Sequence, residues 1–76
     1  MRHYPVESGN ILSIGYDPVS CTMEVVFNLQ PTTVYIYQNV PCIAVVTVMF
    51  AESVGHAFHE TVKKQPEMFP YTKEHR

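Results

Sequence analysis

The chain has 76 residues, which is enough for one domain and too few for two. Hydrophobic residues make up 46% and charged residues only 16%, a balance that is too apolar for an intrinsically disordered chain. The net charge is −2 with only five Lys and Arg residues. Such a chain lacks the surface of clustered basic residues with which nucleic-acid binding proteins usually neutralise phosphate.

The sequence indicates neither a secretory signal nor a membrane segment. The first residues lead into a polar stretch, and no apolar run approaches the roughly 18 residues that span a bilayer. Cys21 and Cys42 form no metal-binding motif, so we expect free thiols in a cytoplasmic protein without membrane association. A core this small supplies little net stability, and chains of this size often gain more by self-association.

The first half of the chain predicts strands joined by short links. Residues 1–9 are expected to be a lead-in, because Pro5 and Gly9 interrupt regular structure. The predicted strands cover residues 10–16, 21–28 and 33–37. Gly15 within the first strand indicates a bulge or a close backbone approach. Gln30-Pro31-Thr32 is expected to be a break between the second and third strands, and the short links favour an antiparallel meander.

The second half predicts helices. Asn39 is expected to cap a main helix over about residues 41–53, with Pro41 in its first turn. The valine-rich run within it would also suit a buried strand, but its length and the opening favour a helix. A short second helix is expected over about residues 55–64, with Gly55 in a left-handed turn at the junction.

Two prolines, Pro66 and Pro70, prevent regular helix beyond this point. Residues 65–76 are therefore expected to form an extended tail. The predicted fold class is α+β: a three-stranded antiparallel β-meander followed by one main helix and a short second helix, in a single domain of residues 1–76.

Three segments resemble one known family. They read V-x-S-x-N-I-x-x-I-G-Y-D at 6–17, Y-x-Y-x-N-V-P at 35–41 and A-x-S-x-G-x-x-F at 51–58. In this order and spacing they resemble the KTSC domain, which is named for its occurrence at the C-terminus of some lysyl-tRNA synthetases and which also forms small stand-alone proteins. The match covers about residues 6–63. The resemblance implies a cytosolic, non-enzymatic domain of largely unknown function, for which RNA binding has been suggested from the synthetase association.

The main helix is apolar on two opposite sides. The side expected to pack on the sheet carries Ala44, Val45, Val48, Met49 and Ala51. The opposite side carries Ile43, Val46 and Phe50. This second side is either covered by the tail through Phe69 and Tyr71 or forms an interface with a second copy or a protein partner. The short, proline-broken tail favours the interface.

Tyr35 and Tyr37 lie on one face of the third predicted strand and could stack unpaired bases, with Lys63 and Lys64 touching phosphate. Packing of both tyrosines in the core is the favoured alternative, because the three predicted strands contain no Lys or Arg. RNA is therefore a partner that the charge supports only weakly.

No residue set predicts catalysis, a metal or a cofactor. His56 and His59 have the spacing of a helical metal pair but lack a third ligand. Cys42 near a helix start has no oriented base beside it, so we expect no catalytic residues. The sequence predicts a small non-catalytic module that self-associates or docks on a macromolecule through the main helix. The alternatives are RNA binding and an oligomer that holds a small ligand between its subunits.

Overall fold

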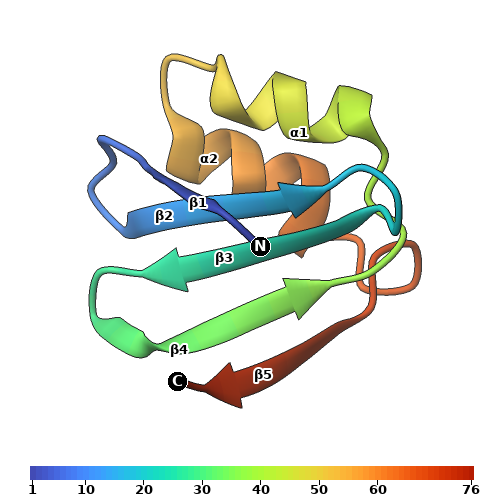
Figure 1. Cartoon of the computed structure of the whole chain (residues 1–76). Helices are drawn as coiled ribbons and strands as arrows, with labels where there is room; N and C mark the ends of the chain where they lie inside the picture. The colour runs from blue at the N-terminus through green and yellow to red at the C-terminus, as the bar shows by residue number, and fades with distance from the viewer.

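A five-stranded antiparallel sheet and a layer of helices form the protein, and the computed structural model describes all residues, 1–76. The strands follow one another across the sheet in chain order, so the sheet is a meander (Figure 1). They are β1 (His3–Pro5), β2 (Ile11–Asp17), β3 (Thr22–Phe27), β4 (Gln30–Tyr37) and β5 (Tyr71–His75). The predicted α+β class is confirmed, but three strands was wrong, because the sheet has five.

The two additional strands are the edges of the sheet. β1 pairs with β2 inside the expected lead-in of residues 1–9, and β5 pairs with β4 inside the expected tail of residues 65–76. Every residue of β5 is exposed, and β1 contains a proline. Neither segment has the apolar alternation that indicates a strand from sequence alone. Pairing with a neighbouring strand, rather than burial of its own side chains, makes each of them a strand.

The expected break at residues 30–32 is also wrong, because these residues begin β4. Phe27 pairs with Gln30 and Val25 pairs with Tyr35, so residues 31–34 lie opposite Val26 alone. Such an irregular ladder tolerates Pro31, which has no N–H to donate.

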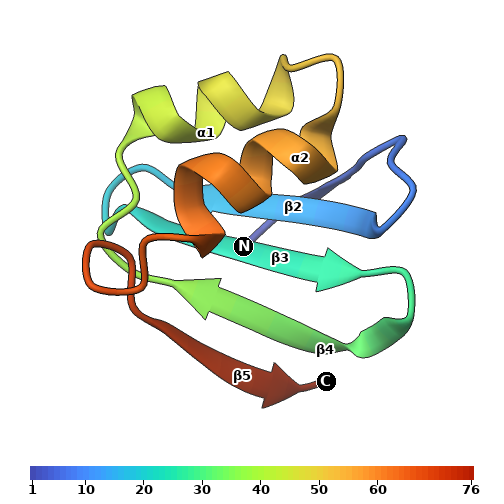
Figure 2. The same ribbon diagram turned by 180° about the vertical axis from the view of Figure 1, so that it is seen from behind.

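The helices all cover one face of the sheet. The sheet lies in front of the helices in Figure 1 and behind them in Figure 2. They are α1 (Cys42–Met49), α2 (Val54–Phe58) and the π-helical η1 (His59–Lys63), which continues α2. The main helix thus ends at Met49, short of the expected residue 53. Asn39 does not cap it: its φ of 60° places it in a left-handed turn, and the N-cap is Pro41, which makes no side-chain capping bond.

Gly55 has a role different from the predicted one. It has no positive φ, and it lies inside α2 rather than in a left-handed turn. Ser53 caps this helix by accepting a hydrogen bond from the backbone N–H of His56 at 3.4 Å. A Cβ at Gly55 would collide with the Asn10 side chain and would lie 3.1 Å from the Ser8 hydroxyl oxygen. Glycine therefore leaves room for the Asn10 and Ser8 side chains, which precede β2, against α2.

The core lies between the sheet and the helices. It consists of Ile11, Ile14, Met23, Val25, Tyr37, Val40, Ala44, Val45, Val48, Phe58, Val62 and Phe69. Ala44, Val45 and Val48 are buried, as the predicted sheet-facing side of the main helix requires. Phe69 contributes to this core and Tyr71 to β5, so the tail does not cover the second side of α1.

Candidate functional site

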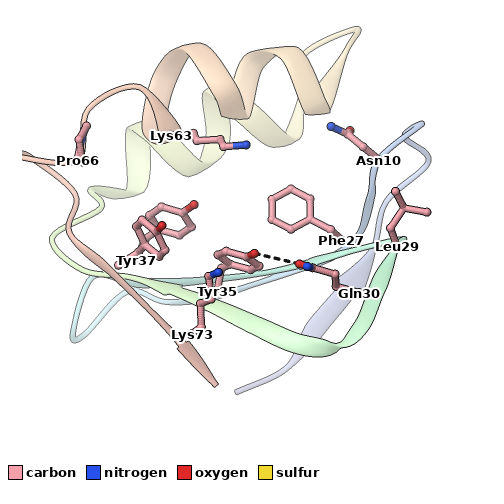
Figure 3. Close-up of a pocket in the computed structure, with 10 residues that line it drawn as sticks. Asn10, Phe27, Leu29, Gln30, Tyr35, Tyr37, Lys63, Pro66 and Lys73 are labelled. Carbon is pink, nitrogen blue, oxygen red and sulfur yellow. Dashed lines mark hydrogen bonds between the residues drawn. The ribbon is translucent and has the colours of Figure 1, made fainter. Parts of the chain in front are cut away.

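A groove of about 710 Å³ opens on the helix side of the sheet, between η1 and strands β3 to β5 (Figure 3). Its lining includes Phe27, Tyr35, Tyr37, Lys63, Tyr71 and Lys73. We call it the aromatic groove. Four of these six side chains are aromatic and two are cationic.

Strand pairing places these side chains on one face. Tyr35 and Tyr37 are two residues apart on β4 and therefore point to the same side of the sheet. On β5, Lys73 pairs with Tyr35 and Tyr71 pairs with Tyr37, so both β5 side chains join the same face. Lys63 reaches the groove from η1 above the sheet (Figure 3).

Tyr35 is held firmly at the centre of the groove floor. Its ring and the Phe27 ring form a T-shaped contact with centroids 5.1 Å apart, and the centroid of the Tyr71 ring lies at 5.8 Å. Its hydroxyl donates a hydrogen bond of 2.9 Å to the Gln30 side-chain oxygen (Figure 3). The ring remains half-buried, so part of it is accessible from the groove.

Tyr37 is a core residue whose hydroxyl end borders the groove. It is only 3% exposed, and its ring packs against Phe58 with centroids 5.3 Å apart. Burial, with the neighbouring Tyr71 and Tyr35, raises the pKa of Tyr37 to about 12, so the phenol stays protonated. Of the two tyrosines proposed to stack bases, only Tyr35 has a ring that a ligand could reach.

The groove is cationic although the chain as a whole is acidic. The Lys63 ammonium lies 5.8 Å from the Phe27 ring centroid and that of Lys73 lies 5.4 Å from the Tyr35 centroid. Neither ammonium forms an ion pair, and no Asp or Glu lines the groove. Lys64 lies outside the groove and pairs with Glu60 at 3.4 Å.

The structure therefore brings together Tyr35, Tyr37 and Lys63 of the predicted nucleic-acid set and separates Lys64 from them. It adds Lys73, which sequence reasoning missed. Tyr71 and Lys73 are two residues apart, which is the spacing of side chains on one face of a strand. This spacing could not be interpreted in a segment that was expected to be an unpaired tail.

The second side of α1 is exposed to solvent. Ile43, Val46 and Phe50 are 71%, 43% and 84% exposed. We call these three residues the α1 patch. No residue of α1 is charged. Val46 and Phe50 also border a shallow apolar groove of about 390 Å³ between α1 and the strands β1 and β2, which includes Tyr4 and Tyr16.

The remaining candidate residues are not brought together. His56 and His59 are both exposed, and no group of three or more His, Cys, Asp or Glu residues is arranged to hold a metal ion. Cys42 is exposed at the start of α1 and Cys21 is partly buried, and both thiols are free. No helix of the chain has the length and apolar character needed to cross a membrane.

The three family-like segments meet in the fold. Ser8 and Asn10 of the first contact Gly55 of the third. The Tyr16 hydroxyl of the first donates a hydrogen bond of 2.6 Å to the carbonyl oxygen of Val40 in the second. The protein is thus a small α+β domain, and contacts between these three segments hold its meander and its helices together.

This domain is of a known kind. The KTSC domain family matches residues 7–65, and the chain belongs to this family. A KTSC domain protein from Yersinia pestis of known crystal structure has a TM-score of 0.79 and 33% sequence identity, over 99% of this chain and 96% of that one. An uncharacterized protein from Stutzerimonas stutzeri (strain A1501) is 32% identical over 65 residues, which are 86% of this chain and 89% of that protein.

Proposed function

We propose that this protein is a small non-catalytic interaction module that associates with a second copy of itself through the α1 patch. The observation that supports it best is the exposure of Ile43 on α1 and of Phe50 directly after it, at 71% and 84%, beside a helix that has no charged residue. Interface cores are depleted in charged residues and enriched in aromatic ones. A protein partner of matching apolar character is the alternative occupant of the same patch.

Self-association would use the patch and the neighbouring groove together. In a twofold dimer the same surface serves both copies, so a projecting side chain and a hollow beside it can be complementary. Phe50 projects beside the apolar groove between α1 and the β1–β2 edge. Burying the three patch side chains would contribute roughly 4–8 kcal/mol before the costs of association.

Sedimentation equilibrium across a wide range of protein concentration tests this proposal. We expect the native chain to form dimers and Val46→Glu to sediment as a monomer, because an interface would bury the new carboxylate. His59→Glu on η1 adds the same charge at another exposed helical position and is the matched control. A native chain that is monomeric at every concentration would rule out self-association and leave a protein partner as the occupant.

RNA binding is a second function, supported by the convergence of Tyr35 and Lys63 in the aromatic groove. The burial of Tyr37 and the pairing of Lys64 with Glu60 reduce the surface available to an extended strand. A ligand held between subunits would need a site completed by the α1 interface. We further propose a cytoplasmic location, which the two free thiols support.

A further inference from the structure

We infer that the aromatic groove binds a single nucleoside phosphate, with the base on Tyr35 and the phosphate between Lys63 and Lys73. This site is separate from the α1 patch and does not depend on self-association. The ligand chemistry is a planar heterocycle joined to an anionic group, and it could come from a free nucleotide or from one unpaired nucleotide of an RNA.

The floor of the groove suits a planar ring. Tyr35 has a fixed orientation because the Phe27 and Tyr71 rings pack against it and the Gln30 side chain accepts a hydrogen bond from its hydroxyl. A ring that is already ordered loses little entropy when a base stacks on it. Because the Tyr37 ring is buried, the accessible aromatic surface belongs to Tyr35 and Tyr71. Their ring centroids are only 5.8 Å apart, so the two rings form one platform for a single base.

The two lysines suit an anion. They approach the groove from opposite layers, Lys63 from η1 and Lys73 from β5 (Figure 3). Two of the chain's five Lys and Arg residues thus lie in one groove that has no carboxylate, in a protein of net charge −2. Each ammonium has three donors and no carboxylate partner in the chain, and each lies over an aromatic ring instead. On binding, a base that stacks on Tyr35 would displace the Lys73 ammonium from that ring toward the phosphate.

The dimensions suit a ligand of this size. A volume of about 710 Å³ falls within the range of roughly 300–1,000 Å³ typical of small-molecule sites. The side-chain amides of Asn10 and Gln30 lie at the end of the groove away from Pro66 (Figure 3). They provide hydrogen-bonding groups for the edge of a base, and the Tyr37 phenol can donate a further hydrogen bond.

Titration of the full chain with adenosine 5′-monophosphate, followed by amide chemical shifts, tests the inference. We expect saturable shifts around Tyr35 and Lys73, and binding at least fivefold weaker for adenosine or for inorganic phosphate alone. Lys63→Ala should weaken binding about tenfold. Lys64→Ala, which removes the same charge from the adjacent residue outside the groove, should change it less than twofold. Tyr35→Leu, which keeps an apolar side chain in the floor, should also weaken binding about tenfold.

Absence of saturable binding at millimolar nucleotide, or equal losses for Lys63→Ala and Lys64→Ala, would overturn the inference. The same titration with a ten-residue oligoadenylate separates the two sources of the ligand. An affinity close to that of the mononucleotide per site supports a one-nucleotide groove. An affinity a hundredfold higher that depends equally on Lys63 and Lys64 would replace the groove with an extended RNA surface. Val46→Glu should leave nucleotide binding unchanged, so failure of self-association and failure of this site are distinguishable.

Discussion

The carboxylate of Glu24, on the central strand β3, accepts hydrogen bonds from both terminal nitrogens of Arg76, at 3.0 and 3.1 Å. Arg76 follows β5 at one edge of the sheet. From the opposite edge, Nε2 of His3 on β1 lies 2.7 Å from the same carboxylate. Glu24 is only 5% exposed, although it lies on the face of the sheet without helices. One central carboxylate therefore joins both edge strands to the middle of the sheet.

This arrangement predicts an acid-sensitive fold. Burial by itself raises the pKa of Glu24, but the hydrogen bonds from His3 and Arg76 outweigh it, so the folded pKa lies below the ordinary value of 4.5. The native state thus holds this proton less tightly than the unfolded chain does. The resulting stability is fully present above about pH 4.5 and is lost as the pH falls through the folded pKa.

Urea unfolding at pH 7 and at a series of lower pH values measures this effect. Glu24→Gln should lower the free energy of unfolding by about 1–3 kcal/mol at pH 7 and flatten its dependence on acid pH. Glu67→Gln removes an exposed carboxylate that forms no ion pair and is the control, with an expected change within about 0.5 kcal/mol. A Glu24→Gln variant with the native acid dependence would show that another group is responsible.

Replacement of Gly15 by a larger residue is predicted to destabilise the fold by displacing the side chain of His3. A Cβ at Gly15 would lie 2.7 and 2.9 Å from two atoms of the His3 ring. The ring that bonds to Glu24 therefore packs directly on this glycine. Gly15→Ala should therefore displace the ring and destabilise the protein by about 1–2 kcal/mol.

A double-mutant cycle with His3→Ala checks this mechanism by thermal or urea unfolding. The cost of Gly15→Ala should shrink by more than half in the His3→Ala background, because the obstructing ring is gone. Equal costs in both backgrounds would place the strain elsewhere in the sheet.

Gly55 should tolerate substitution less well than Gly9. A Cβ at Gly55 collides with the side chain of Asn10 and approaches Ser8, whereas one at Gly9 has nothing within 4 Å. We expect Gly55→Ala to destabilise the protein by about 1–3 kcal/mol, despite the higher helix propensity of alanine. Gly9→Ala should change stability by less than about 1 kcal/mol in either direction. Similar unfolding midpoints for the two variants would contradict the close approach seen at Gly55.

The two phenylalanines of the helical layer should behave in opposite ways. Phe58 is 1% exposed and packs against Phe27 and Tyr37, so Phe58→Ala should cost about 3–5 kcal/mol of stability. Phe50 belongs to the exposed α1 patch, and Phe50→Ala should change the stability of the monomer by no more than about 0.5 kcal/mol. Unfolding measured at a concentration where the chain is monomeric separates these effects. A large loss for Phe50→Ala under that condition would mean that the α1 patch stabilises the monomer itself.

Local patterns predicted much of this fold. The strands β2 and β3 and the buried side of α1 follow from apolar residues at the spacing of strands and of a helix. The same spacing predicted the α1 patch of Ile43, Val46 and Phe50. Gly15 was expected to mark a bulge or a close backbone approach, but the group that lies against it is the side chain of His3, and the register shift of β2 falls between Ile11 and Ser13.

Contacts between segments distant in the chain decided the rest. β1 and β5 are exposed strands that pair with residues far away in the chain, such as His3 with Gly15 and Thr33 with His75. No local sequence pattern therefore indicates them. Their pairing brings Lys73 beside Tyr35 and closes the aromatic groove. The sequence alone determined which side chains are apolar, aromatic or charged along each element. Only tertiary structure decided which of them share a surface, because that depends on the order and register in which strands pair.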